Sequence, residues 1–324
     1  MASRAVWRHR AGYNQGMIAT PSPSVVGLPD SGAVPGPELI QQLLTEATRL
    51  TTPCGQGELV WHAWHRPDPA APSMLPPLVL LHGGSGSWTH WVRNIAPLIA
   101  AGRQVFVPDL PGFGDSAPPP SGRDADALVA PLEDGLRRLL DGAVSAGHQA
   151  CDLVGFSFGG LTAGLLAAAH PERVHRLVLC GAPGLGIASR RTVQLMAWRH
   201  LADPAAVDAV HRQNLTALMF AHAASITPLA LAVHRANVVR DRMPGRRLAY
   251  TDALLQALRQ LHCPVAAIYG QEDALYQGRL EGLRAALQTA PNFRGLALIE
   301  DAGHWVQFER PDAFDTALAA ALSA

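Results

Sequence analysis

The chain has 324 residues, 48% of them hydrophobic, and its 26 basic side chains balance 26 acidic ones. This length suits one large α/β domain or a domain with a sizeable insertion, and the balanced charge gives no electrostatic basis for binding nucleic acid or an anionic membrane. Three of the four cysteines, Cys151, Cys180 and Cys263, fall in or beside apolar runs. That placement is typical of small buried side chains, so we expect a cytoplasmic protein without disulfides or a zinc cluster.

The N-terminal residues 1–37 are rich in Gly, Pro, Ser and Ala and lack the continuous apolar segment of a secretory signal. They predict a loose tail, in which Met17 is an alternative translation start to Met1. No membrane span is expected, because the most apolar long stretch, residues 215–233, contains His222, Ser225, Thr227 and Pro228.

After the tail, residues 38–50 have apolar side chains at helical spacing and predict an amphipathic helix, and residues 58–64 predict a strand. A buried strand predicted at residues 77–81 runs into a glycine-rich loop that begins His82-Gly83-Gly84. Such a loop can direct a backbone N–H at a developing oxyanion, or it can be a plain turn into a helix. It matches neither phosphate-binding glycine pattern, so no nucleotide cofactor is expected.

The next predicted strand, residues 105–108, ends at Asp109, whose carboxylate we expect to bond nearby loop amides. A helix predicted at residues 124–146 then leads to an apolar run at residues 151–156, which predicts a short buried strand.

The pattern Gly155-x-Ser157-x-Gly159 follows that strand and precedes a helix rich in Ala and Leu. It is typical of a sharp strand-to-helix turn that holds the middle side chain clear of the sheet on a strained backbone. The glycines are needed because a Cβ at either position would collide with a neighbouring strand or helix. Ser157 would lie at a helix N-terminus, where free N–H groups favour developing negative charge.

A strand predicted at residues 176–183 ends the regular alternation of strands and helices. Residues 187–262 contain no convincing strand and are too long for a simple connection, so we expect a helical lid between a first core part, residues 38–186, and a second, residues 263–324. The helical patterns in the lid are Arg191–Leu201, Ala205–Phe220, Leu229–Met243 and Tyr250–Leu261.

The second core part brings two further polar residues to predicted strand ends, Asp273 and His304. Strands separated by helices imply a mostly parallel sheet, in which ligands bind beyond the carboxyl ends of the strands. The predicted strands are residues 264–270 and 296–300, and the predicted helices are residues 280–289 and 314–322.

Five motifs, all beside predicted strand ends, resemble those of the α/β-hydrolase superfamily. From about residue 57 to the end, the sequence looks like the lidded branch of that superfamily. The resemblance implies a mostly parallel, twisted sheet flanked by helices, with the lid inserted late in the chain. The motifs are Leu80 to Gly84, Asp109 to Ser116, Gly155 to Gly160, Gly270-x-x-Asp273 and Gly303-His304-Trp305.

By this resemblance Ser157 is the nucleophile, His304 its base and Asp273 the carboxylate that orients the base. The chemistry requires such a trio because a serine hydroxyl is a poor nucleophile at neutral pH until an imidazole removes its proton. The carboxylate fixes the imidazole tautomer and stabilises the imidazolium. Glu272 competes for the acid role, but related sequences place the acid three residues after the strand-ending glycine, which favours Asp273.

The resemblance also assigns the backbone N–H groups of Gly84 and Phe158 to an oxyanion hole. Dehalogenases and epoxide hydrolases of the same branch carry aspartate in place of Ser157, so the serine leaves attack on a carbonyl carbon as the expected chemistry. Candidate pocket residues are Gly83, Phe156, Arg235 and Trp305.

Two features indicate different substrates. Residues 303–309 resemble carbon–carbon hydrolases of aromatic ring-cleavage products, and Arg235 falls near the place of their substrate-binding arginine. Those enzymes usually carry asparagine before the nucleophile, whereas Phe156 stands there in this chain and suits a less polar ester or lactone. We therefore expect a serine hydrolase of a small, mainly apolar ester or lactone, with carbon–carbon hydrolysis as the alternative.

A non-catalytic small-molecule binder on the same fold is a third alternative. Such proteins commonly lose a member of the catalytic trio, whereas all three positions are filled here. We expect a small-molecule substrate as the partner and neither cofactor nor metal ion, and a homo-oligomer stays open.

Overall fold

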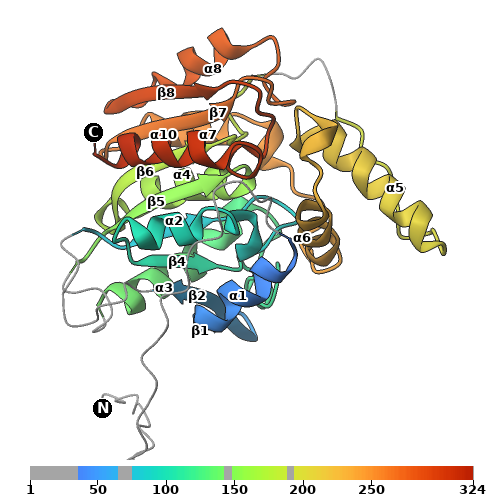
Figure 1. The fold of residues 1–324 in the computed structure, drawn as a ribbon. Helices are drawn as coiled ribbons and strands as arrows, with labels where there is room; N and C mark the ends of the chain where they lie inside the picture. Colours follow the sequence, from blue (N-terminus) through green and yellow to red (C-terminus); the bar gives the residue numbers. More distant parts are fainter. Residues whose placement is uncertain (1–35, 65–74, 142–147, 188–192, 324) are drawn as a thin grey trace, which may run out of the picture. The chain divides into compact units, whose positions relative to one another are not determined.

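An eight-stranded sheet runs through the part of the chain that the structure, a computed structural model, describes: residues 36–64, 75–141, 148–187 and 193–323. Its strand order is β1-β2-β4-β3-β5-β6-β7-β8 (Figure 1). Residues 1–35 of the tail predicted at residues 1–37, with the choice between Met1 and Met17, lie outside the described residues. The strands are β1 (Thr48–Cys54), β2 (Gly57–Trp64), β3 (Leu78–Leu81), β4 (Val105–Pro108), β5 (Cys151–Phe156), β6 (Val174–Cys180), β7 (Val265–Gly270) and β8 (Phe293–Ile299).

The sheet is mostly parallel. Strands β3 to β8 pair in parallel, and β2 pairs antiparallel with both β1 and β4. The central strand β5 is buried along its whole length, as expected for a parallel strand covered on both faces. The predicted α/β fold class is therefore confirmed.

Alternate residues of each strand enter two hydrophobic cores, one on each face of the sheet. In β3, Val79 and Leu81 belong to one core, and Leu78 and Leu80 belong to the other. Figure 1 shows α2 and α10 in front of the sheet. Helices with side chains in the first core are α3 (Val129–Leu140), α4 (Phe158–Ala169), α7 (Ala253–Leu258) and α8 (Leu280–Leu287), and those with side chains in the second are α1 (Glu38–Glu46), α2 (Ile95–Ala100), α6 (Pro228–Val238), α9 (Val306–Glu309) and α10 (Pro311–Ser323).

Several predicted helices differ from the structure in their bounds, two of them in the first core part. The helix predicted at residues 38–50 ends at Glu46, because the following residues form β1 and pair with β2 along its whole length. The β-branched threonines of β1 also favour a strand. The helix predicted at residues 124–146 begins as a 3-10 turn, η2 (Ala125–Leu128), and continues as α3; residues 142–147 lie outside the described part.

Between β6 and β7 lies an insertion, residues 181–264, whose described part contains helices and turns and no strand, as predicted. Its helix α5 (Pro204–Asn214) begins at Asp203, whose carboxylate accepts two backbone N–H groups of the first turn at 3.2 Å. The hydroxyl of Thr227 caps α6 (Pro228–Val238) in the same way. A proline opens each helix, where its missing N–H leaves no bond unmade. The short remaining elements of the chain are η1 (Trp88–Trp91), η4 (Pro171–Arg173), the π-helix η5 (Leu215–Met219), η6 (Ala223–Ser225) and η7 (Leu248–Tyr250).

The helix predicted at residues 191–201 is wrong over its described part, residues 193–201, which contains no helix. A side chain holds the backbone there instead. The Met196 N–H donates to Asn214 Oδ1 at 2.7 Å, and Asn214 Nδ2 donates to the Met196 carbonyl at 3.0 Å. These two bonds replace those that a helix would supply.

The C-terminal part of the insertion is tied to the core loops that follow β3 and β4. Asn237, at the end of α6, accepts a hydrogen bond from the Ser87 hydroxyl at 2.7 Å and donates one to the Thr89 hydroxyl at 3.0 Å. Arg242 Nη2 donates to the Gly114 carbonyl at 3.1 Å. Of the five residues in these bonds only Arg242 is charged, so the attachment depends mainly on hydrogen-bond geometry rather than on net charge.

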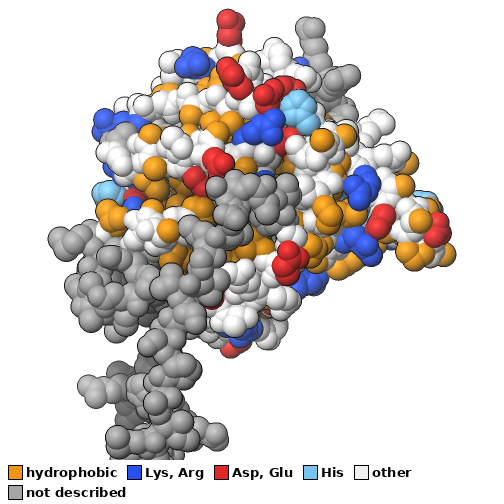
Figure 2. Space-filling model, viewed as in Figure 1, with side chains coloured by type: hydrophobic (Ala, Val, Ile, Leu, Met, Phe, Trp, Pro, Cys, Tyr) orange, Lys and Arg blue, Asp and Glu red, His pale blue; other side chains and the backbone are white. Residues whose placement is uncertain are grey.

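The surface in view carries no block of one charge. Figure 2 shows acidic and basic side chains interspersed with hydrophobic ones on that face. Within the described ranges, every helix is too short or too polar to cross a membrane.

Candidate active site

The turn between β5 and α4 holds Ser157 beyond the end of a central strand. Its φ of +50° and ψ of −119° are strained for a residue with a side chain. A Cβ on Gly155 would lie 2.5 Å from the Gly159 carbonyl oxygen, and one on Gly159 would lie 2.4 Å from the His82 carbonyl oxygen. Since these are backbone atoms, only glycine fits at both positions. Ser157 itself stays partly exposed.

His304 lies between Ser157 and Asp273. Its Nε2 is 2.8 Å from Ser157 Oγ, and its Nδ1 is 2.9 and 3.0 Å from the two carboxylate oxygens of Asp273. A carboxylate only accepts, so Nδ1 carries the proton and the Nε2 lone pair faces the serine hydroxyl. His304 and Asp273 are buried, whereas Glu272 is exposed. This arrangement can transfer a proton from the hydroxyl to the imidazole.

Two buried histidines, here called the two-histidine clamp, hydrogen-bond to the backbone of Gly83, one at its carbonyl and one at its N–H. His82 Nε2 accepts the Leu110 N–H at 2.8 Å, so its Nδ1 carries the proton and donates to the Gly83 carbonyl at 2.8 Å. His90 Nδ1 accepts the Gly83 N–H at 3.2 Å. Burial lowers the pKa of His82 to about 4 and lowers the pKa of His90 well below its ordinary value. Both rings are therefore neutral at pH 7.

Within this clamp, the bond from His82 to the Gly83 carbonyl fixes the direction of the Gly84 N–H group. A peptide is planar with its C=O and N–H opposed, so the Gly84 N–H points away from His82. It has no hydrogen-bond partner within the described residues, and the Phe158 N–H opens α4, where no intrahelical acceptor exists. A Cβ on Gly83 would lie 3.2 Å from Ser157 Cβ. Two unpaired N–H groups are thus available beside the serine.

Two predicted pocket residues are core residues instead. Phe156 is fully buried, with its ring centroid 5.1 Å from that of His304. Trp305 is also buried, and its Nε1 donates to the His90 carbonyl at 3.0 Å. Both side chains therefore support the histidines from the core side. Gly83 is buried as well, beside Phe156.

A carboxylate that the sequence reasoning did not single out braces the His304 loop. Glu309 is buried and accepts three backbone N–H groups, from Gly303 at 2.7 Å and from Ala221 and His222 at 3.0 Å each. It joins the loop of His304 to the middle of the insertion, between η5 and η6. The closing motif carried this residue, but its spacing alone gave no sign of the partners.

Asp109 meets the expectation of a structural role. Its Oδ1 accepts the Trp88 N–H at 2.9 Å and its Oδ2 accepts the Asp115 N–H at 2.8 Å. It therefore joins the loops after β3 and β4.

The arginine beside these loops is Arg246 and not the predicted Arg235. Arg235 is exposed on α6 and pairs with Asp208 of α5 at 3.0 Å, so its guanidinium is directed at the outer helix. Arg246 lies against Gly84, with Nη2 3.4 Å from where a Cβ of that glycine would be, and its Cζ is 5.3 Å from the Phe158 ring centroid. The sequence reasoning missed Arg246 because it follows a Pro-Gly turn with no helical or motif spacing.

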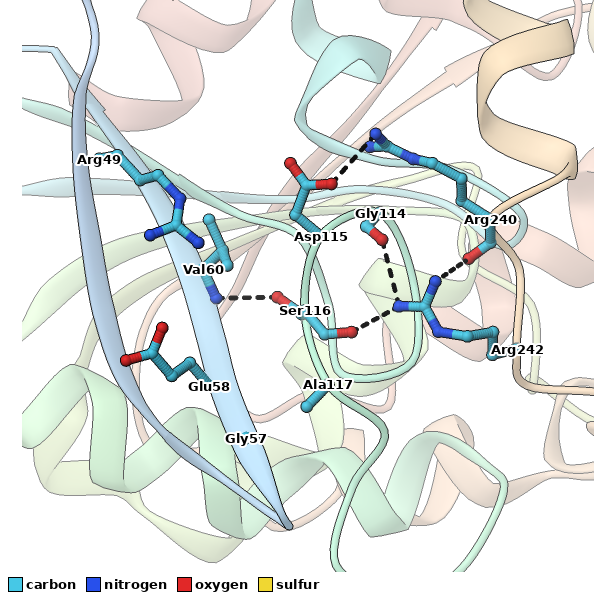
Figure 3. Close-up of a pocket in the computed structure, with 10 residues that line it drawn as sticks. All are labelled: Arg49, Gly57, Glu58, Val60, Gly114, Asp115, Ser116, Ala117, Arg240 and Arg242. Atoms are coloured by element: carbon cyan, nitrogen blue, oxygen red, sulfur yellow. Dashed lines mark hydrogen bonds and ion pairs between the residues drawn. The ribbon is translucent and has the colours of Figure 1, made fainter.

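Other polar groupings lie apart from Ser157. A hollow of about 590 Å³ lies between β2 and the loop after β4 (Figure 3), and its floor includes the bond from the Val60 N–H to Ser116 Oγ at 2.8 Å. Three arginines and two acids face it, and its lining residues are Arg49, Gly57, Glu58, Val60, Gly114, Asp115, Ser116, Ala117, Arg240 and Arg242. Two clusters bring potential metal-donor atoms within 4.8 Å of one another: Glu133-His170-Glu172, in which only Glu172 is fully exposed, and His222-Glu272-Asp301, which is exposed throughout. Exposed acidic groups of this kind are common without a metal ion, so neither cluster is assigned.

The comparison with family models gives one match over most of the chain. A model described as the alpha/beta hydrolase fold matches residues 76–311. That range contains the turn at Ser157, the loops of Asp273 and His304, and the whole insertion.

Similar proteins include two hydrolases of ring-cleavage products. The chain is 30% identical over 258 residues to the 2-hydroxy-6-oxo-6-phenylhexa-2,4-dienoate hydrolase of Burkholderia cepacia, covering 74% of this chain and 84% of that protein. It is 31% identical over 257 residues to the 2-hydroxymuconate semialdehyde hydrolase of Pseudomonas sp. (strain CF600), covering 74% and 83%. Among solved structures, the carboxylesterase CesB of Bacillus subtilis aligns with a TM-score of 0.67 at 19% identity, covering 88% of this chain and 96% of that one.

Proposed function

Because the chain belongs to the family of proteins with the alpha/beta hydrolase fold, we propose that it is a serine hydrolase of small, mainly apolar carboxylic esters or lactones. The observation that carries the proposal is the continuous hydrogen-bond chain from Asp273 through His304 to the partly exposed Ser157. The order of nucleophile, acid and histidine along the chain is also that of the family.

In the first half of the reaction, Ser157 Oγ attacks the carbonyl carbon while His304 Nε2 takes its proton. Asp273 holds the His304 tautomer and stabilises the imidazolium that forms. The tetrahedral oxyanion accepts hydrogen bonds from the N–H groups of Gly84 and Phe158. When it collapses, the bond to the alcohol oxygen breaks, and that oxygen takes the proton from His304.

In the second half, a water molecule attacks the acyl-enzyme. His304 removes a proton from the water, the same two N–H groups stabilise the second oxyanion, and the acid leaves as Ser157 recovers its proton. The neutral rings of His82 and His90 take no part in proton transfer, because each uses a ring nitrogen to hold the Gly83 peptide.

The polarity of the surroundings supports an uncharged substrate. Arg235 is committed to Asp208, so its guanidinium is not available to pair with a substrate carboxylate. A buried carboxylate without a paired cation costs several kcal/mol. A neutral ester or lactone avoids that cost.

Carbon–carbon hydrolysis is the second candidate, and the relatives favour it. Both ring-cleavage hydrolases named above align over more than four-fifths of their length. In this reaction the same attack would occur at a ketone carbonyl, and a carbon leaving group would take the proton. It would require a cation for the dienoate carboxylate.

Labelling with a fluorophosphonate probe tests for an activated serine whatever the natural substrate. We expect the native protein to be labelled and Ser157→Ala to be unlabelled, with kcat lowered roughly a million-fold and the fold retained. Near-normal turnover by folded Ser157→Ala would contradict the assignment. Absence of labelling in the native protein would favour the non-catalytic binder.

Substrate class is decided by kcat/KM on p-nitrophenyl esters of graded chain length and on 2-hydroxy-6-oxo-6-phenylhexa-2,4-dienoate. We expect the neutral esters to be turned over faster. A clear preference for the dienoate would overturn ester hydrolysis in favour of carbon–carbon hydrolysis and leave the role of Ser157 intact.

A further inference from the structure

A partly buried ion pair, Arg246–Asp241, lies beside Gly84 and the ring of Phe158, the two residues whose N–H groups are the proposed oxyanion donors. Arg246 Nη1 donates to Asp241 Oδ1 at 2.9 Å, and Nη2 donates to Asp241 Oδ2 at 3.0 Å. The two side chains are only 21% and 14% exposed. A bidentate pair of this kind fixes the orientation of the guanidinium, which a single hydrogen bond would not do.

Further bonds hold this pair to the oxyanion loop. Asp241 Oδ2 accepts the Ser85 hydroxyl at 2.6 Å, and Asp241 Oδ1 accepts the Met243 N–H at 2.9 Å. Arg246 Nη1 also donates to the Met243 carbonyl at 2.5 Å. The guanidinium is thereby fixed over the Phe158 ring and beside Gly84.

Arg246 still has donor capacity to offer a ligand. An arginine has five N–H donors, and three are used by Asp241 and Met243. Among the described residues, the Nε–H and the second Nη2–H have no hydrogen-bond partner, and Nη2 is the atom nearest the Cβ position of Gly84. The face toward the oxyanion loop therefore offers hydrogen bonds from a fixed donor.

The net charge of the Arg246–Asp241 pair is close to zero. Burial would raise the pKa of Asp241, but the hydrogen bond and charge of Arg246, with the Ser85 hydroxyl, outweigh it and hold that pKa below its ordinary value. Asp241 is therefore ionised at neutral pH and cancels the charge of Arg246. An anionic acyl group would meet a paired cation, whereas a neutral hydrogen-bond acceptor would meet an available donor.

From this geometry we propose that Arg246 is a specificity-determining residue of the substrate site, and that Asp241 masks its charge so that the site selects uncharged acyl groups over anionic ones. This inference rests on the proposed ester hydrolysis. It also accounts for a site that has an arginine and yet suits neutral substrates.

The test uses a matched pair of esters of equal chain length, p-nitrophenyl hexanoate and mono-p-nitrophenyl adipate. The quantity measured is the ratio of kcat/KM for the anionic adipate ester to kcat/KM for the neutral hexanoate. It is compared in the native protein, Asp241→Asn, Arg246→Met, the double variant and a control, Arg235→Met, which removes an equal charge away from Ser157. Thermal melting checks that each variant is folded.

Unmasking the arginine in Asp241→Asn should raise the ratio about tenfold or more, because hydrogen bonds to an unpaired charge are the stronger kind. Arg246→Met leaves Asp241 as an unpaired anion and should lower the ratio by a similar factor. The double variant should return near the native ratio, and Arg235→Met should stay within about twofold of it.

The two single variants are independent, so if one fails to fold the other still decides. A ratio that stays within about twofold in the folded single variants, or that moves equally in Arg235→Met, would overturn the inference. Failure of the native protein to hydrolyse either ester or to react with the fluorophosphonate would instead sink the proposed function. The two failures are therefore distinguishable.

Discussion

Replacing His82 by phenylalanine tests whether the two-histidine clamp prepares the oxyanion hole. Phenylalanine keeps the ring but removes the Nδ1–H that holds the Gly83 carbonyl and the Nε2 that accepts the Leu110 N–H. The Gly83–Gly84 peptide is then free to rotate, and the Gly84 N–H loses its direction. Loss of one oxyanion donor lowers kcat by about 100- to 1,000-fold, which sets the upper limit of the effect. KM should change much less, because the donor acts on the transition state.

His82→Phe should also lower the stability of the protein, and this loss can be measured separately from the loss of kcat. The Gly83 carbonyl and the Leu110 N–H would each be left without a hydrogen-bond partner. Each loss should lower the free energy of unfolding by about 1–3 kcal/mol, which denaturant unfolding measures. His82→Asn is the matched control, because the asparagine Nδ2 can take the place of the histidine Nδ1 and keep the bond to Gly83 while still losing Leu110. His82→Asn should therefore lose the stability that the Leu110 bond contributes and retain most of kcat. A folded His82→Phe protein with kcat within about threefold of native would refute the reasoning.

Three further predictions concern stability. Glu309→Gln leaves at least one of the three N–H groups that bond to Glu309 without an acceptor and should lower the free energy of unfolding by about 1–3 kcal/mol, measured by urea titration. Gly159→Ala should prevent stable folding because its Cβ would meet backbone oxygens at 2.4 and 2.6 Å, whereas Gly282→Ala on α8, with open space around its Cβ, should stabilise by about 0.5–1 kcal/mol; equal melting temperatures would contradict this contrast. Burial, with a smaller contribution from His211, lowers the pKa of His234 to about 4. Since the unfolded ring titrates near 6.5, the unfolded state binds more protons between these values, and stability falls as pH drops from about 6.5 to 4. His234→Gln should remove up to about 3 kcal/mol of that loss, and parallel pH profiles for variant and native protein would disprove it.

The sheet was predictable because its central strands are continuous apolar runs followed by polar or glycine-rich turns. β5 and β7 follow this pattern and lie where the sequence indicates. β1 was missed because residues 38–50 keep helical spacing, and only the pairing with β2 decides that Thr48 onward is a strand. The side chain of Asn214 likewise overrides the helical pattern around Met196. In both places, contacts with another segment of the chain determine the local structure that the sequence pattern alone did not predict.

The same distinction holds for the candidate site. Ser157, Asp273 and His304 each follow a strand, so their proximity depends on local motifs and on the geometry of a parallel sheet. Arg246 reaches Gly84 through a loop whose course depends on Asp241 and Ser85. No local pattern encodes that course. The spacing that suggested Arg235 fixed a position along α6 but not the direction of the side chain.

The insertion between β6 and β7 has a consequence for how the chain folds. These strands are neighbours in the sheet, yet roughly 80 residues separate them, and each doubling of such a loop adds only about 0.6 kcal/mol of closure entropy. The rate of folding is more sensitive, because distant pairings form late. Ser157 precedes the insertion, and Asp273 and His304 follow it. Recovery of fluorophosphonate labelling during refolding should therefore lag behind recovery of helical signal, and would report when the last strands have joined the sheet.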